Sequence, residues 1–129
     1  MEERHQLTDK DILQNAESRP WGIYRVLLET PYTKVKEIVV HPHQRLSLQY
    51  HNHRSEVWTV VKGDGSVQLG DETAKIFTED VVQILEKEPH RIMAGDNGIT
   101  FIEVQLSSDG IFSEDDIIRI DDDYGRIEE

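Results

Sequence analysis

The sequence predicts an all-β fold, namely a double-sheet barrel of the jelly-roll type that follows a short N-terminal arm. From Trp21 onward, short runs rich in Val, Ile, Thr and aromatic residues alternate with turn signals. Short strands at regular spacing are typical of an antiparallel sandwich or barrel. In addition, polar side chains that could bind a ligand fall at alternate strand positions, so they would share one inward face. This second pattern favours a barrel that encloses a site.

The N-terminal arm covers residues 1–20, and the barrel domain covers residues 21–129. In the arm, Thr8-Asp9-Lys10-Asp11 resembles a helix-capping box, in which an N-cap Thr is followed three residues later by an acid. A short helix is therefore predicted to run from Thr8 to about Glu17, where the approach of Pro20 ends it.

Nine strands are predicted in the barrel, each bounded by Gly, Pro, Asp or Asn turn residues. They are Ile23–Glu29, Thr33–Val40, Arg45–His53, Val57–Val61, Ser66–Leu69, Ala74–Phe77, Val81–Leu85, His90–Met93 and Thr100–Leu106. The last strand alternates in polarity, since one face carries Ile102, Val104 and Leu106 and the other carries Phe101, Glu103 and Gln105. The acidic segment after Ser113 is expected to be either a short helix packed outside the barrel or a frayed tail, with Ile117, Ile118 and Ile120 as its apolar anchors.

Composition limits the possible functions. The chain has 129 residues, which is typical of one domain, and its net charge of −12 argues against a nucleic-acid partner. It has no cysteine, which excludes disulfides and thiolate ligands. No run approaches the roughly 18 apolar residues of a membrane span, and the N-terminus has no apolar signal core. We therefore expect a cytoplasmic protein with no membrane partner.

A group of histidines and one glutamate predicts a metal site. In a strand, alternate side chains share a face, so Gln49, His51 and His53 would point the same way. Glu56 and His90 would then complete the shell around one ion. Imidazole and carboxylate together favour Zn, Co, Mn, Ni or Fe over Ca and Mg, and zinc is our first choice. Alternatively, the histidines line a polar cavity or a surface strand without metal, and Gln49 either is a further ligand or hydrogen-bonds the substrate.

Several cations lie near the histidines in the sequence and could bind a small anion. They are Lys34, Lys36, Arg45, Arg54 and Arg91. The alternative is that these cations are scattered over the surface, where they balance the acids.

The order of the site residues resembles the first cupin motif. That motif has His-x-His, a nearby Glu and a strand that ends in Gly, here Gly63, and His90 stands where the second motif supplies a further ligand. The resemblance is partial, because Pro42-His43 replaces the usual Pro-Gly. The second motif is also reduced, since only Pro89-His90 remains of its Pro-x-Gly-x-x-His.

Longer stretches resemble one cupin family, type II mannose-6-phosphate isomerase, over about residues 19 to 126. They are Arg19-Pro20-Trp21-Gly22-Ile23-Tyr24, Lys34-Val35-Lys36-Glu37-Ile38, the run from Leu46 to Trp58, Phe101-Ile102-Glu103-Val104-Gln105, Glu114-Asp115-Asp116-Ile117-Ile118-Arg119 and Asp123-Tyr124-Gly125-Arg126. In many bacteria this domain is the C-terminal part of a bifunctional protein with mannose-1-phosphate guanylyltransferase. The nucleotidyltransferase part is absent here, so we expect a stand-alone cupin.

The resemblance implies a metal-dependent isomerase that interconverts mannose 6-phosphate and fructose 6-phosphate, with a sugar phosphate as its substrate and a homodimer as its assembly. Aldose–ketose isomerisation requires a base near the carbon-bound proton, and phosphate requires cationic, forked donors. We assign catalytic roles to Glu103, Lys36 and Arg54, with Glu56 as an alternative base. Substrate-binding roles fall to Gln49, Arg45, Arg91 and Gln105.

One departure from the family favours alternative functions. The family usually reads Arg-Ala-Glu-His-Trp where this chain has Arg54-Ser55-Glu56-Val57-Trp58. Strict strand alternation would turn residue 57 away from the metal, whereas a bulge would turn it inward. If the missing histidine matters, the chain is a non-catalytic cupin that binds a sugar phosphate or a sugar nucleotide. A different metal cupin enzyme, such as a dioxygenase, is the third possibility.

Overall fold

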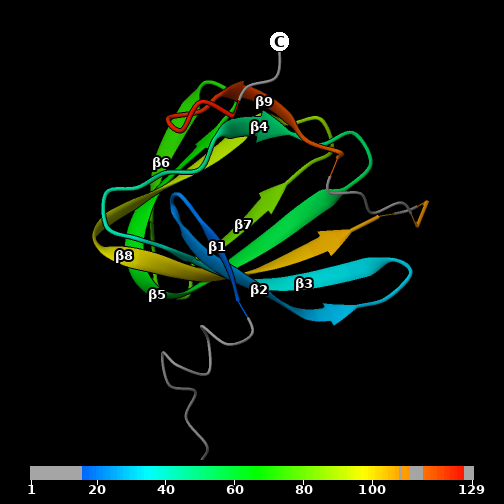
Figure 1. The fold of residues 1–129 in the computed structure, drawn as a ribbon, viewed down its shortest axis with the longest axis horizontal. Helices are drawn as coiled ribbons and strands as arrows, with labels where there is room; N and C mark the ends of the chain where they lie inside the picture. Colours follow the sequence, from blue (N-terminus) through cyan, green and yellow to red (C-terminus); the bar gives the residue numbers. More distant parts are fainter. Residues whose placement is uncertain (1–15, 108, 111–114, 127–129) are drawn as a thin grey trace, which may run out of the picture.

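The computed structural model describes residues 16–107, 109–110 and 115–126, which contain nine β-strands and no helix (Figure 1). The strands are β1 (Glu17–Arg19), β2 (Gly22–Glu29), β3 (Thr33–Val40), β4 (Leu48–Tyr50), β5 (Ser55–Leu69), β6 (Glu72–Phe77), β7 (Val81–Ile84), β8 (His90–Leu106) and β9 (Ile118–Asp121). The described part of the chain holds no helix with the length and apolarity needed to cross a membrane.

Two long strands, β5 and β8, join the two halves of the barrel. One half has the order β1-β2-β3-β8-β5-β7, and the other has the order β9-β4-β8-β5-β6, with antiparallel pairing throughout. Figure 1 looks into the barrel, with β2 and β3 on one side and β4 and β9 on the other. The predicted all-β double-sheet barrel is confirmed.

Glycines allow β5 and β8 to bend without breaking their pairing. The sequence predicts two strands separated by a turn in place of β5, and two more in place of β8. Instead, pairing continues through Gly63↔Ile99 and Gly65↔Ala94, with a register shift between the two glycines. A Cβ on Gly63 would lie 2.2 Å from the carbonyl oxygen of Gly98. Gly63 and Gly98 both have a positive φ, which favours glycine. The two strands therefore bend together and carry the chain from one half of the barrel to the other.

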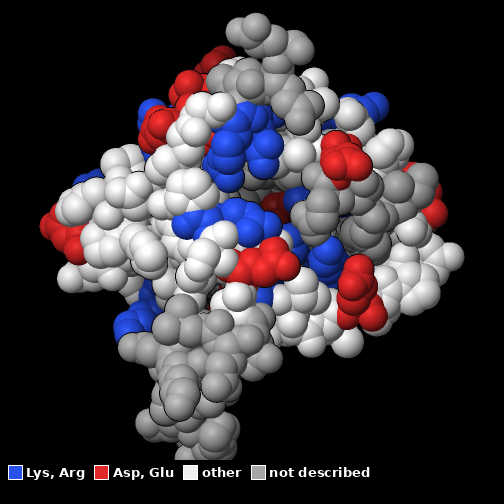
Figure 2. Space-filling view, in the orientation of Figure 1, with Lys and Arg blue, Asp and Glu red and all other residues white. Residues whose placement is uncertain are grey.

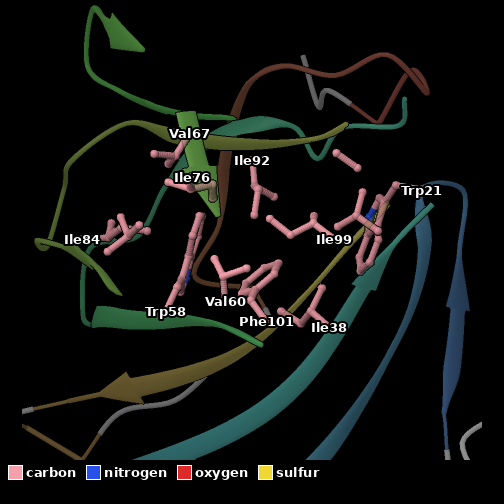
Figure 3. Packing of buried hydrophobic residues seen from close by; sticks show 13 residues of the cluster. Trp21, Ile38, Trp58, Val60, Val67, Ile76, Ile84, Ile92, Ile99 and Phe101 are labelled. Atoms are coloured by element: carbon pink, nitrogen blue, oxygen red, sulfur yellow. The ribbon is translucent and has the colours of Figure 1, made fainter. Parts of the chain in front are cut away.

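An apolar cluster fills part of the barrel interior (Figure 3). Ile38, Val60 and Phe101 come from one half, and Ile92 comes from the other; each is at most 5% exposed. Burial of each such side chain contributes roughly 1.5–3 kcal/mol. This cluster marks the inward faces of β3, β5, β6, β7 and β8, and on β5 and β8 the same faces carry polar side chains further along.

Strand β8 turns its polar face inward. Phe101, Glu103 and Gln105 are buried, whereas Leu106 on the opposite face is 41% exposed. The predicted alternation is therefore correct, and Glu103 and Gln105 face the interior rather than water. The interior of the barrel changes from apolar to polar along this strand.

The two ends of the domain differ from the prediction. Within residues 115–126, the C-terminal segment is neither a helix nor a frayed tail, because β9 pairs with β4. Ile118 and Ile120 are 41% and 48% exposed, so they do not anchor it. At the other end, β1 pairs with β2 and includes Glu17. The rest of the predicted N-terminal helix lies outside the described residues, apart from Ala16.

Candidate active site

Three buried side chains from separate elements converge inside the barrel. The ligand atoms of His51, Glu56 and His90 all lie within 4.8 Å of one another. His51 Nε2 lies 3.3 Å from Glu56 Oε2, and His90 Nε2 lies 3.9 Å from Glu56 Oε1. Glu56 belongs to β5, His90 opens β8, and His51 follows β4. The two halves of the barrel thus face each other across this cluster.

Both histidines turn their Nε2 atoms into the cluster. His51 Nδ1 lies 2.7 Å from the Asp116 carbonyl oxygen, and His90 Nδ1 lies 2.8 Å from that of Glu88. A carbonyl only accepts hydrogen bonds, so each Nδ1 carries a proton. His51 Nε2 then accepts a hydrogen bond from Arg54 Nη2 at 3.2 Å. Burial lowers the pKa of His51 to about 4, which keeps the ring neutral.

This donor set fits a divalent metal. His90 Nε2 is buried and has no hydrogen-bond partner within the described residues, although buried polar atoms are normally paired. Two imidazoles and a carboxylate are typical ligands of zinc and similar ions. Gln49 lies beside this set, because it pairs with His90 across β4 and β8 and lines the adjoining cavity.

His53 does not lie with the other histidines. Strand β4 ends at Tyr50, and the Asp116 carboxylate then accepts hydrogen bonds from the backbone N–H groups of Asn52 and His53, both at 2.9 Å. The chain turns, so strand alternation no longer applies. The His53 ring is 48% exposed and lies 3.4 Å from Asp109. The expectation that Gln49, His51 and His53 share one face is therefore wrong for His53.

A second carboxyl group lies against Glu56. Arg54 Nε and Trp58 Nε1 each donate to Glu56 at 2.9 Å, and Glu103 also hydrogen-bonds it. Burial opposes ionisation of Glu56, but the hydrogen bond from Glu103 and the charge of Arg54 outweigh it and lower its pKa. Burial and the charge of Glu56 raise the pKa of Glu103 well above its usual range. The pair therefore holds one proton, on Glu103.

A cavity of about 220 Å³ adjoins the cluster. Four of the predicted site residues line it, namely Lys36, Gln49, Arg54 and Glu103. Figure 2 shows Lys and Arg side chains gathered around a central hollow in the surface. A cavity with cationic walls and a protonated carboxyl can bind a small anion and transfer protons to it.

Three other predicted site residues lie away from this cavity. Arg45 donates to both carboxylate oxygens of Asp123, at 2.7 and 2.8 Å. Arg91 donates to the carbonyl oxygens of Leu46 and Asp121. These arginines tie the C-terminal segment to the barrel. Gln105 is buried beside Glu56 in register, but it does not line the cavity.

Sequence reasoning missed three cations in the cavity wall, namely Arg19, Arg119 and Arg126. They are distant from the histidines in the sequence, so proximity along the chain does not indicate them. A signal was present, because each arginine lies in one of the stretches that resemble the isomerase family.

Comparison with known proteins assigns the family. Residues 7–122 match the family described as "Mannose-6-phosphate isomerase C-terminal". The chain belongs to this family. It is 40% identical over 109 residues to the xanthan biosynthesis protein XanB of Xanthomonas campestris, an alignment that covers 84% of this chain and 23% of XanB. It is also 40% identical over 112 residues to the alginate biosynthesis protein AlgA of Pseudomonas aeruginosa, covering 86% of this chain and 23% of AlgA.

A third relative of the family is a mannose-1-phosphate guanylyltransferase of Klebsiella pneumoniae. It is 33% identical over 108 residues, which cover 84% of this chain and 23% of the relative. The chain thus spans less than a quarter of the length of these relatives.

Solved structures support the cupin fold. Oxalate decarboxylase of Bacillus subtilis superposes with a TM-score of 0.71 at 22% identity, over 81% of this chain and 29% of that one. A double-stranded β-helix protein of Klebsiella pneumoniae superposes with a TM-score of 0.68 at 22% identity, over 86% of this chain and 96% of that one. At such identities the likeness shows the fold alone.

Val57, which replaces the histidine usual in the family, lies on the outer face of β5. From residue 55 to residue 60 this strand alternates strictly, with Glu56, Trp58 and Val60 buried and facing inward. Val57 pairs in register with Val104, and the irregular step comes later, after Val60. No bulge turns residue 57 toward the cluster, so this departure leaves the interior of the site unchanged.

Proposed function

We propose that this domain is a metal-dependent isomerase that interconverts mannose 6-phosphate and fructose 6-phosphate. The supporting observation is that the protonated Glu103 lines a cavity together with several cations and also hydrogen-bonds Glu56 of the His51–Glu56–His90 cluster. Membership of the mannose-6-phosphate isomerase C-terminal family supports the same reaction. The whole-protein activities of XanB and AlgA are not assumed, because this chain covers only 23% of each.

His51, Glu56 and His90 would hold the metal, with Gln49 as a further donor; zinc is our first choice among zinc, cobalt, manganese, nickel and iron. A bound divalent ion would act as a Lewis acid that stabilises negative charge on the substrate oxygens. The neutral His51 ring and the ionised Glu56 carboxylate are donors that suit such an ion. Trp58 and Arg54 hold the Glu56 carboxylate in its orientation.

Glu103 would move a proton between the substrate oxygens. It lines the cavity, whereas Glu56 does not. Since Glu103 holds the proton of the pair, it can donate it to the carbonyl oxygen, and its carboxylate can then accept the proton of the neighbouring hydroxyl. Lys36 lies opposite Glu103 in the register of β3 and β8 and also lines the cavity. We assign Lys36 to the transfer of the carbon-bound proton or to stabilisation of the enediolate charge.

The proposal is tested by loading the metal-free chain with each of the five metals and measuring fructose 6-phosphate formed from mannose 6-phosphate. We expect turnover with at least one metal, and we expect Glu103→Gln to lower kcat about 10²- to 10⁴-fold. Glu72→Gln is the matched control, since Glu72 is exposed on β6. The absence of turnover with every metal, beside an active reference isomerase, would refute the reaction.

Binding without turnover would instead support the alternative of a non-catalytic cupin that recognises a sugar phosphate or a sugar nucleotide. Uptake of oxygen by the iron-loaded protein would support the third possibility, a dioxygenase. The two readouts separate these alternatives from the isomerase in the same set of samples.

A further inference from the structure

Five cationic side chains line one small cavity in a chain whose net charge is −12. They are Arg19, Lys36, Arg54, Arg119 and Arg126. Among the described residues of the wall, Glu103 is the one acid. The cavity is therefore a positive site within a negative protein, which favours an anionic ligand.

Two of these cations, Arg19 and Arg126, pair with acids that lie outside the cavity wall. Arg19 Nη2 donates to Glu17 at 2.9 Å, and Arg126 donates to both carboxylate oxygens of Asp122, at 2.8 and 3.0 Å. Neither acid lines the cavity. A guanidinium has five N–H donors, so two bonds to Asp122 leave Arg126 further donors for a ligand. The carboxylates thus orient the guanidinium groups without closing the cavity.

Exposure divides the cations into an inner and an outer set. The Lys36 and Arg54 side chains are buried close to Glu103. The Arg19 and Arg126 side chains are 38% and 25% exposed, so they stand at the mouth. Arg119 lies opposite Gln49 in the register of β9 and β4, and both residues line the cavity.

We propose that Arg19, Arg119 and Arg126 form a binding subsite for the phosphoryl group of a sugar phosphate, whose sugar reaches inward to Glu103. Guanidinium groups are the preferred donors for phosphate because their planar fork bonds two oxygens at once. The orientation of the sugar toward Glu103 rests on the proposed isomerase function. This subsite replaces Arg45 and Arg91, which bind the C-terminal segment instead.

The size of the cavity narrows the ligand class. About 220 Å³ is below the roughly 300–1,000 Å³ of sites that hold drug-sized ligands. A monosaccharide phosphate suits this space better than a sugar nucleotide, which carries a base and a second sugar. Free inorganic phosphate has the same chemistry as the phosphoryl group, so the experiment must separate these three ligands.

Calorimetry on the zinc-loaded chain tests the subsite with mannose 6-phosphate, mannose, inorganic phosphate and GDP-mannose as ligands. We expect Arg119→Gln to weaken the binding of mannose 6-phosphate about 10- to 100-fold, the loss expected for a charged hydrogen bond. Arg119→Lys should restore part of it. Binding of unphosphorylated mannose should not change between the variants, and GDP-mannose should bind more weakly than mannose 6-phosphate.

The matched control is Arg45→Gln, which removes a carboxylate-paired arginine from the same end of the barrel but not from the cavity. It should bind mannose 6-phosphate like the parent chain. Arg19→Gln is a second test variant on the short strand β1, for use if Arg119→Gln does not fold. Parent-like affinity in either folded variant, or an equal loss in Arg45→Gln, would overturn the subsite.

Kinetics distinguish failure of the subsite from failure of the isomerase. If both are correct, Arg119→Gln raises KM for mannose 6-phosphate more than it lowers kcat. Turnover with an unchanged KM in Arg119→Gln would refute the subsite alone. Phosphate-dependent binding that requires Arg119, without turnover by any metal-loaded sample, would refute the isomerase alone.

Discussion

Asp116 fixes the turn that carries His51, so its removal should weaken both the fold and the metal site. Its carboxylate accepts hydrogen bonds from the backbone N–H groups of Asn52 and His53 at 2.9 Å each. Its own carbonyl oxygen accepts the Nδ1 proton of His51 at 2.7 Å. One residue of the C-terminal segment thus holds three consecutive residues that lie more than sixty positions away in the sequence.

The change Asp116→Asn allows the loss of folding stability and of metal affinity to be estimated. An amide oxygen can keep one of the two backbone bonds, but its NH₂ group would face the other N–H as a donor against a donor. One hydrogen bond to a charged acceptor is worth roughly 1.5–3 kcal/mol, and partial solvent exposure reduces this to about 1–2 kcal/mol. For a domain of this size, the melting temperature should fall by about 4–8 °C. Metal affinity should fall about 10-fold, because the turn that orients His51 loosens.

Differential scanning calorimetry and zinc titration of the metal-free chain measure these two effects. Asp115→Asn is the control, because it removes the neighbouring charge without touching the turn's two N–H bonds. The reasoning would be refuted if Asp116→Asn melted and bound zinc like the control. The pKa of Asp116 gives a further check: burial opposes its ionisation, but the two backbone bonds outweigh burial and lower its pKa. Its stabilising contribution should therefore be complete above about pH 4 and should be lost as the pH falls below that value.

Three further predictions concern the histidines and the outer face of the barrel. Zinc affinity should fall at least about 10-fold in His51→Ala but stay at the parent value in His53→Ala, by titration against a chelator; equal losses would restore His53 to the ligand set. In the metal-free chain, burial lowers the pKa of His51 in the folded state to about 4 from an ordinary 6.5. The neutral His51 ring therefore contributes fully to stability above pH 6.5, and this contribution is lost as the pH falls toward 4. The free energy of unfolding should change by about 3 kcal/mol over this range. Urea titrations across this range should show that loss, and a flat profile would contradict it. We also expect a homodimer, because Val61 and Leu106 are 45% and 41% exposed on the outer face, and a monomeric mass by light scattering at micromolar concentration would argue against it.

The strands were predictable because alternation and turn residues are local signals. The alternation of Phe101, Glu103 and Gln105 also predicted their shared face. The pattern of histidines with Glu56, together with the family resemblance, indicated the residues of the His51–Glu56–His90 cluster. What failed depended on contacts between distant segments. The sequence does not show that Asp116 ends strand β4 early and turns His53 outward, nor that Asp123 engages Arg45.

The structural role of Gly63 and Gly98 also depended on contacts between distant segments. Gly63 and Gly98 are consistent with either a turn or a bend, and only the pairing partner of each strand decides between the two. The position of Arg119 in the cavity wall could not be predicted from local sequence patterns. Strand β9 forms by pairing with β4 and lies in a highly acidic segment. Its inward direction follows from that pairing rather than from any pattern in the segment itself.

Arg91 and backbone bonds of Gln44 and Leu46 attach the edge formed by β4 and β9 to β8, but strand β4 itself is thinly paired. Strand β4 has three residues, and it meets β8 through the single pair Gln49↔His90. Segments with few cross-strand bonds open at low free energy, before the remainder of a domain unfolds. Such opening would carry His51 away from Glu56 and uncover the interior, which gives ions and sugars a route inward without dissolving the core. Amide hydrogens of Leu48–Tyr50 should therefore exchange quickly in the metal-free chain and slowly once zinc bridges the two halves.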